Sequence, residues 1–161
     1  MASSERASVS LRVIPEERLA PWIEHTARQY IASRERMGES TADAEAAARR
    51  SLETAFPDGR VAEGHLVFDI LADDEPVGVL WLGPHPMRHD DRSWWVNDIE
   101  IDEAHRGRGY GREAMELAEA VVHAEDGRTL GLNVFGFNHA ARALYESLGY
   151  EVDALQMSKR V

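Results

Sequence analysis

The sequence predicts an α/β fold in which helices cover both faces of one central sheet. Segments typical of strands alternate with segments of helical periodicity along the chain. Turn-forming residues separate these segments, as in the tripeptide PDG at residues 57–59. The 161 residues are enough to bury a core without metals or disulfides. We therefore expect a single domain over residues 1–161, with residues 1–8 as a flexible N-terminus.

The first part of the chain predicts one strand and two helices. Residues 8–13 alternate in polarity, which is typical of a strand. Pro15 favours the start of a helix that extends to about residue 37. The inner face of this helix is expected to contain Leu19, Trp22, Ile23, Thr26 and Tyr30. Gly38 interrupts the pattern, and an alanine-rich helix follows over residues 41–55.

The middle of the chain predicts three consecutive strands. Residues 65–71 and 77–82 are rich in large apolar side chains, and the acidic turn at residues 73–76 joins them as antiparallel neighbours. A polar loop over residues 83–92 then leads to a longer strand at residues 94–101, which is rich in aromatic and β-branched residues.

The last part predicts a helix, a strand, a second helix and a final strand. Apolar residues recur at helical spacing over residues 114–122. Residues 130–134 predict a strand, and residues 138–148 predict a helix that ends at Gly149. Residues 150–157 predict the last strand.

The most informative segment is RGRGYG at residues 106–111, which is followed at once by Arg112. It joins a predicted strand to a predicted helix, so the first backbone N–H groups of the helix have no partner of their own. Glycines let the main chain approach a ligand closely, and the arginines and the helix dipole add positive potential. The segment therefore indicates a pyrophosphate site and a diphosphate-bearing cofactor.

Two other phosphate-binding motifs fit this segment less well. A Walker loop requires a lysine followed by serine or threonine, which the sequence lacks. A dinucleotide fingerprint requires G-x-G-x-x-G early in a βαβ unit, whereas the three glycines here are spaced G-x-G-x-G and come late in the chain. A nucleotide-binding regulatory domain is kept as an alternative, and it predicts binding of ATP or NAD in preference to coenzyme A.

The segment resembles the R/Q-x-x-G-x-G/A signature of the GNAT superfamily of N-acetyltransferases, with Arg106, Gly109 and Gly111 at the three defined positions. The resemblance extends over residues 94–150, including IEIDEAHRGRGYGREAMELAE and LNVFGFNHAARALYESLGY. It implies a GNAT-like fold with a mixed, mostly antiparallel sheet whose central strands splay apart. Acetyl-CoA would bind between the strands at residues 94–101 and 130–134.

The resemblance also implies which residues contact acetyl-CoA. Backbone groups of Ile99 and Ile101 would bind the pantetheine and the acetyl carbonyl. The full set of implied contacts is Ile99, Glu100, Ile101, Arg106, Gly107, Arg108, Gly109, Tyr110, Gly111, Arg112, Asn138 and Tyr145.

Asn138 and Tyr145 lie seven residues apart and so share one stripe of the predicted helix. The resemblance places Asn138 at the cofactor and Tyr145 beside the thioester sulfur, where it would protonate the leaving thiolate. Apart from the family, Asn138 is explained as a helix N-cap and Tyr145 as a core aromatic residue.

Transfer to an amine requires a group that attracts the ammonium and removes its proton, because an ammonium of pKa about 10.4 is not nucleophilic at neutral pH. Asp98 and Glu100 are the candidates. They share one face of a regular strand, but a bulge, which the family usually has here, would shift that parity. We favour Glu100 as the base and Asp98 as a substrate-binding residue. Asn133 stands where some family members carry a glutamate that acts as base, which leaves polar substrate or water binding as its role.

Composition narrows the class of partner. Lysine and arginine total 18 and aspartate and glutamate total 29, so the net charge is −11. This charge argues against general affinity for nucleic acid or anionic membranes and suits a cationic amine substrate. The sequence has no cysteine, no signal-like start and no apolar run long enough to span a bilayer, so we expect a cytoplasmic protein, with a homodimer as a possible assembly. No metal is expected, because Pro84 and Pro86 place His85 and His89 in a loop.

Together these features predict an N-acetyltransferase that moves the acetyl group of acetyl-CoA directly to a primary amine of a small molecule or a protein. No covalent enzyme intermediate is expected, since the chain has no cysteine and no serine in a nucleophile elbow. The alternative is a non-catalytic acyl-CoA-binding sensor module that keeps the phosphate site without turnover.

Overall fold

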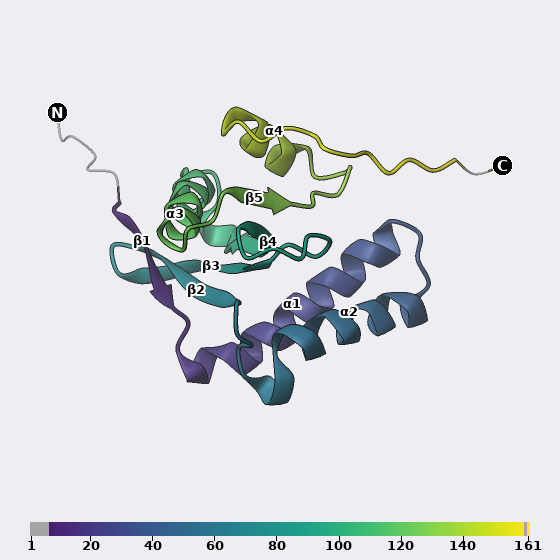
Figure 1. Ribbon diagram of the computed structural model, residues 1–161, viewed down its shortest axis with the longest axis horizontal. Helices are drawn as coiled ribbons and strands as arrows, with labels where there is room; N and C mark the ends of the chain where they lie inside the picture. Colours follow the sequence, from purple (N-terminus) through teal and green to yellow (C-terminus); the bar gives the residue numbers. More distant parts are fainter. Residues whose placement is uncertain (1–6, 160) are drawn as a thin grey trace.

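The structure, a computed structural model, describes residues 7–159 and 161. One sheet of strand order β1-β2-β3-β4-β5 lies at its centre (Figure 1). Neighbouring strands are antiparallel except for β4 and β5, which are parallel. The strands are β1 (Val9–Val13), β2 (Leu66–Ala72), β3 (Glu75–Pro84), β4 (Ser93–Ile101) and β5 (Thr129–Leu132). The prediction of a mixed, mostly antiparallel sheet is confirmed.

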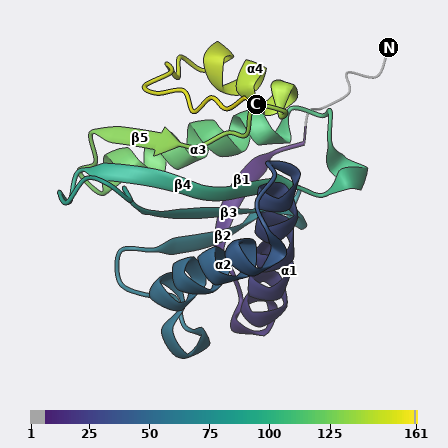
Figure 2. The same cartoon turned by 90° about the vertical axis from the view of Figure 1, so that its right-hand side faces the viewer.

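Helices cover both faces of this sheet, as predicted. Figure 2 shows one pair of helices, α1 and α2, on one face and the other pair, α3 and α4, on the opposite face. The helices are α1 (Glu16–Arg36), α2 (Thr41–Ala55), α3 (Tyr110–Ala124) and α4 (His139–Ser147), with short 3-10 turns η1 (Pro57–Gly59) and η2 (Glu103–His105). The predicted interruption at Gly38 is present, since Gly38 has a φ of 96° directly after α1.

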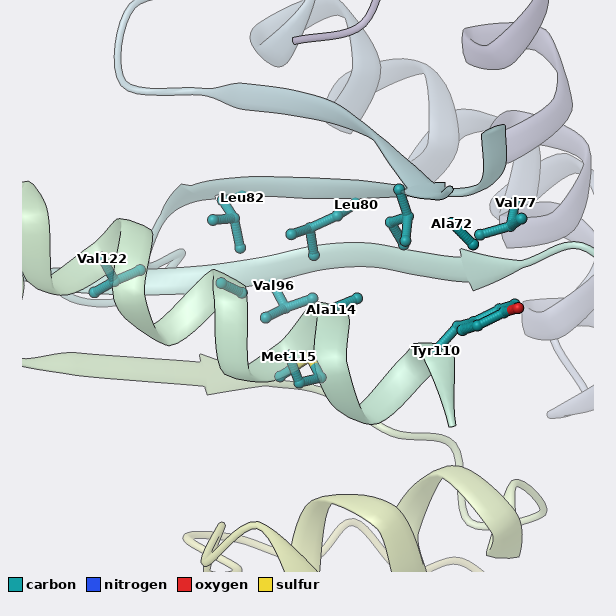
Figure 3. Close-up of a cluster of buried hydrophobic side chains, with 11 residues drawn as sticks. Ala72, Val77, Leu80, Leu82, Val96, Tyr110, Ala114, Met115 and Val122 are labelled. Atoms are coloured by element: carbon teal, nitrogen blue, oxygen red, sulfur yellow. The ribbon is translucent and has the colours of Figure 1, made fainter. Parts of the chain in front are cut away.

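Each helix pair encloses its own core. Figure 3 shows the core between α3 and the sheet, where Ala114 and Met115 of α3 pack against Leu80, Leu82 and Val96 of the strands. These α3 residues recur at the spacing that the sequence predicted for its apolar face.

The second core lies between α1, α2 and the sheet. Trp22 of α1 makes edge-to-face contacts with Phe56 and with Trp81 of β3, at ring-centroid distances of 5.6 and 5.8 Å. All three rings are buried, which fixes the position of α1 over β3 and β4.

The predicted strand at residues 150–157 is wrong, and the sheet has five strands rather than six. The described residues 150–159 form no strand, and Val152, Leu155 and Met157 are exposed. Local strand preference predicted this element, but no described strand pairs with these residues, and a strand forms only beside a neighbouring edge. The strand at residues 130–134 is also displaced, to Thr129–Leu132.

The expected flexible N-terminus falls largely outside the described residues, since residues 1–6 are not among them. Ser8, at the end of that segment, is held in place: its N–H donates to Asp73 Oδ1 at 2.9 Å, and its carbonyl accepts from the Asp73 N–H at 3.0 Å.

A fully buried carboxylate ties three elements together. Asp69 of β2 has no exposed surface. Its Oδ2 accepts a hydrogen bond from Arg12 of β1 at 2.9 Å, and its Oδ1 forms an ion pair with the guanidinium of Arg18 of α1 at 2.8 Å. The side chains of Arg12 and Arg18 are 48% and 39% exposed. Loss of the arginines would therefore leave a charge buried without a partner, whereas loss of the carboxylate would leave cations that water can still reach.

We predict an asymmetric effect of mutation at this ion triad. The double variant Arg12→Gln/Arg18→Gln is expected to lose about 3–5 kcal/mol of unfolding free energy, the usual cost of stranding a buried charge. Asp69→Asn is expected to lose only about 1–3 kcal/mol. Urea unfolding of both variants measures the two values, and a greater loss for Asp69→Asn would contradict this account of the triad.

Candidate active site

The predicted phosphate site lies at the start of α3. Gly107 and Gly109 have φ angles of 75° and 90°, a region that side chains disfavour, and Gly109 is the N-cap of α3. The carbonyl of Gly109 accepts from the N–H groups of Arg112 and Glu113. Within the described residues, the N–H groups of Tyr110 and Gly111 have no partner, so they are available to an anion at the helix N-terminus.

A cavity of about 410 Å³ opens at this helix N-terminus. The three glycines of the loop, Arg106 and Arg112 line it on one side, and Ala140, Ala141 and Leu144 of α4 line it on the other. The structure thus brings together most of the loop residues that the sequence singled out for pyrophosphate.

Three of the residues predicted to contact the cofactor have other interactions in the structure. The side chain of Tyr110 is buried in the core, so only its backbone can serve a ligand (Figure 3). Arg108 does not line the cavity, and its guanidinium donates to the Ala104 carbonyl at 3.1 Å. Asn138 caps α4, because its side chain accepts from the Ala141 N–H at 3.2 Å. Cofactor contacts by Arg108 and Asn138 stay predictions.

The central strands splay apart beside this cavity. Pairing between β4 and β5 ends at Val96 and Leu132, whereas β4 continues to Ile101. Within the part of the chain that the structure describes, the edge of β4 over residues 97–101 therefore has β3 on one side and no strand on the other. Ile99 and Ile101 lie on this stretch, where an extended ligand can add to the free edge as a strand would. Asn133 lies just beyond β5 and is exposed.

A bulge in β4 decides the orientation of the two candidate carboxylates. Trp81 of β3 pairs with Asp98 and Leu82 pairs with Val96, so Asn97 is the extra residue. Because the bulge precedes both carboxylates, Asp98 and Glu100 keep the same face of the strand, which is the face covered by α1.

Two neighbouring residues of α1 bind these carboxylates directly. The Thr26 hydroxyl donates to Asp98 Oδ2 at 2.7 Å, and His25 Nε2 lies 2.7 Å from Glu100 Oε2. On its other side, Glu100 Oε1 lies 3.7 Å from the guanidinium of Arg106, which lines the cavity at the start of α3. Glu100 therefore stands between α1 and that cavity.

Burial raises the pKa of Asp98 above its ordinary value, and the charge of Glu100 adds to the increase, while the Thr26 hydrogen bond opposes it. The pKa of Tyr145 is also raised, first by burial and then by the negative charge of Asp98. Tyr145 of α4 thus keeps its proton at neutral pH close to Asp98, as a proton donor requires.

The raised pKa of Asp98 gives a testable pH dependence of stability. Above the ordinary carboxyl pKa of about 3.9, the unfolded chain loses a proton that folded Asp98 still holds, so stability falls as pH rises through the folded pKa. Asp98→Asn keeps an oxygen that accepts from Thr26, and it removes the group whose titration lowers stability as pH rises. We expect the variant to gain thermal stability relative to the wild type as pH increases from about 4 to 8. A difference in melting temperature that does not change over this range would contradict the prediction.

A second cavity, of about 310 Å³, lies on the α1 side of β4. Its walls are acidic: Glu17 comes from α1, Glu100 and Asp102 come from β4 and the residue after it, and His25 and Arg18 complete the charged set. Trp22 forms part of its apolar wall.

Sequence reasoning missed His25 and Glu17 as site residues and placed Thr26 on the inner face of its helix without a role. Thr26 could have indicated that this part of α1 belongs to the site, since a polar residue on the inner face of a helix requires a hydrogen-bond partner.

Of the two loop histidines, His85 has partners of its own. His85 packs edge to face against Trp95 at 4.7 Å, and its Nδ1 accepts from the Met87 N–H at 3.1 Å. Among the described residues, no group of three or more histidine, cysteine or acidic side chains is placed to hold a metal ion. Across the same part of the chain, every helix is too short or too polar to cross a bilayer.

The model of the acetyltransferase (GNAT) family matches residues 21–150, which include most of α1 together with β4, the glycine loop and α4. The chain therefore belongs to the GNAT acetyltransferase family.

One relative matches nearly the whole chain, and another matches 70% of it. The chain is 25% identical to the uncharacterised N-acetyltransferase YycN of Bacillus subtilis over 156 residues, which are 96% of this chain and 99% of YycN. It is 28% identical over 113 residues to YdgE of the same organism, another uncharacterised N-acetyltransferase, covering 70% of this chain and 71% of YdgE.

Solved structures show the same fold. The crystal structure of YycN has a TM-score of 0.85, covering 96% of this chain and 99% of that one. AAC(6')-Iy, in complex with the bisubstrate analogue CoA-S-monomethyl-acetylneamine, has a TM-score of 0.61 at 13% identity, covering 96% of this chain and 99% of that one.

Proposed function

We propose that this protein is an acetyl-CoA-dependent N-acetyltransferase that acts on a primary amine. The observation that carries this proposal is the meeting of two cavities at the end of β4. Ile101 and Arg106 line the cavity at the start of α3, whereas Glu100 and Asp102 line the acidic cavity under α1. A donor bound in the first and an acceptor bound in the second reach the same stretch of strand.

The first cavity suits the donor. Unpaired amides at Tyr110 and Gly111, with Arg106 and Arg112, are placed to bind a pyrophosphate. A pantetheine arm leaving this point can follow the free edge of β4 towards the bulge at Asn97. Part of the AAC(6')-Iy analogue is also a coenzyme A moiety, which supports the same donor on a related fold.

The second cavity suits a cationic acceptor. Three carboxylates line it or reach it, from Glu17, Glu100 and Asp102, and only Arg18 opposes them. An ammonium group of a small molecule or a peptide is attracted to such a site. The net charge of −11 also makes nucleic acid and anionic membranes poor partners. We further propose that the protein works in the cytoplasm, in keeping with the absence of cysteine from its sequence.

Direct attack requires the amine, the thioester and a proton donor to meet at one place. The neutral amine forms a bond to the acetyl carbon, the carbon–sulfur bond breaks, and the thiolate takes a proton. Tyr145 is the proposed donor of that proton, because its raised pKa keeps it protonated. Asp98, held by Thr26, is proposed to bind the acceptor ammonium.

Two measurements test this proposal. Calorimetry with acetyl-CoA, ATP and NAD identifies the ligand of the first cavity, and thiol release from acetyl-CoA with a panel of amines and peptides detects turnover. We expect acetyl-CoA to bind in preference to both nucleotides and at least one cationic amine to release thiol. Binding of acetyl-CoA without release on any amine would favour the sensor module, and preference for ATP or NAD would favour a nucleotide-binding domain.

A further inference from the structure

His25 has no role in the scheme above, yet it occupies the junction between acceptor cavity and β4. Its Nε2 lies 2.7 Å from Glu100 Oε2, across 75 residues of sequence. The imidazole is 41% exposed and the Glu100 side chain 27%, and both line the acidic cavity. The pair therefore meets the space in which we place the acceptor amine.

Packing of α1 holds His25 at this point. Trp22, one turn before it, is buried against Phe56 and Trp81. Thr26, the next residue, donates to half-buried Asp98. Trp22 and Thr26 lie four positions apart on the helix and so define the face turned to β4. The imidazole is presented by a rigid element rather than by a loop.

We propose that His25 is the group that takes the proton from the acceptor ammonium, with Glu100 as the residue that positions it. This inference rests on the proposed N-acetyltransferase function. In the neutral imidazole, Nε2–H donates to Glu100, which leaves the Nδ1 lone pair to accept a proton. Nδ1 has no partner among the residues that the structure describes.

An ammonium that becomes an amide loses two protons. The first passes to His25 Nδ1 before the amine attacks and is then released to solvent through the exposed part of the ring. Tyr145 gives a proton to the leaving thiolate. The second proton leaves the attacking nitrogen and restores the proton of Tyr145. The enzyme returns to its starting state and one proton is released in each turnover.

His25 is better placed for this role than either carboxylate. Asp98 Oδ2 accepts a hydrogen bond from the Thr26 hydroxyl, and Asp98 is half-buried. Glu100 has one oxygen on His25 and the other 3.7 Å from Arg106. Of these three residues, only His25 combines a free acceptor atom with a path to solvent, and imidazole is the side chain that most often accepts protons in catalysis.

The charges around His25 favour the same step. Glu100 and Asp98 face it from β4, Asp102 follows that strand, and Glu17 faces it from the preceding turns of α1. Arg18 of α1 and Arg106 beyond Glu100 are the cations on this side. This excess of carboxylates attracts the cationic acceptor towards His25.

The test is the variant His25→Gln, whose amide can still donate to Glu100 but cannot accept a proton. Thiol release is measured with acetyl-CoA and three probe amines, putrescine, kanamycin and a lysine-containing peptide, from about pH 6 to pH 10, where the free amine becomes abundant. We expect kcat/KM to fall about 100-fold or more near pH 7 and to recover towards the wild-type value at high pH, because a neutral amine needs no base. Affinity for acetyl-CoA is expected to be unchanged.

His123→Gln is the matched control, since His123 is exposed in the last turn of α3. It should show the wild-type pH profile, and thermal unfolding should show that both variants fold. A wild-type pH profile for His25→Gln, or an equal loss at every pH, overturns the role of His25 while the proposed function stands. A wild-type protein that binds acetyl-CoA but acetylates none of the probes overturns the proposed function, and this inference with it.

Discussion

Replacing Gly109 with aspartate is expected to abolish binding of coenzyme A and acetyl-CoA, with an affinity loss of about 100-fold or more, or about 2.7 kcal/mol. Gly109 caps α3 at a φ of 90° and lines the cavity with the free amides of Tyr110 and Gly111. A carboxylate at this position puts a side chain and a negative charge where the pyrophosphate is proposed to bind. Calorimetry with coenzyme A measures the effect.

Backbone strain needs its own control, because any side chain at a positive φ costs about 1–3 kcal/mol of stability. Gly38 provides it, since Gly38 has a φ of 96° after α1 and a Cβ there would have no atom within 4 Å. Gly38→Asp carries the same strain and charge away from the cavity, so it should lower the melting temperature and leave affinity unchanged. Wild-type affinity in a folded Gly109→Asp variant would refute the phosphate site.

Tyr145→Phe is expected to reduce kcat by about 100-fold or more at neutral pH, the usual contribution of a general acid, with little change in affinity for acetyl-CoA. Burial and the charge of Asp98 raise the pKa of Tyr145, so the wild type should keep its proton donor into the alkaline range. The difference between wild type and variant should shrink only above that raised pKa, where the wild-type phenol has also lost its proton. A pH series of kcat measures both effects.

Tyr150→Phe is the matched control for this experiment. Tyr150 packs edge to face on Tyr145, with ring centroids 5.9 Å apart, and so belongs to the same aromatic pair. Removal of its hydroxyl should leave kcat near the wild-type value. Equal rates for Tyr145→Phe and the wild type would reduce Tyr145 to a packing residue.

A helix or strand of this fold could be predicted where the residues of that segment alone indicate it. The apolar spacing of α3 and the glycine after α1 located both helices within a few residues of their observed ends. The strand at residues 150–157 could not be judged in the same way, because a strand forms only where a neighbour offers its edge and burial.

The residues of the candidate site also differ in whether the sequence alone could predict them. The glycine loop could be predicted, because its proposed function depends on consecutive backbone amides of residues that are adjacent in the sequence. The sequence placed Asp98 and Glu100 on one face only on the condition that the strand is regular between them. The position of the bulge, at Asn97 before both residues, could not be predicted because it comes from the register of β3 against β4. His25 and Thr26 were missed as site residues because their partners are more than 70 positions away in sequence.

By itself, the sequence determined the family, the fold class and the glycine loop before α3, since each depends on residues that are close together in the chain. Tertiary structure alone decided that the sheet has five strands, that β4 and β5 part after Val96, and that α1 places His25 on Glu100. Those features depend on packing and register between distant segments, and local sequence preference does not contain that information.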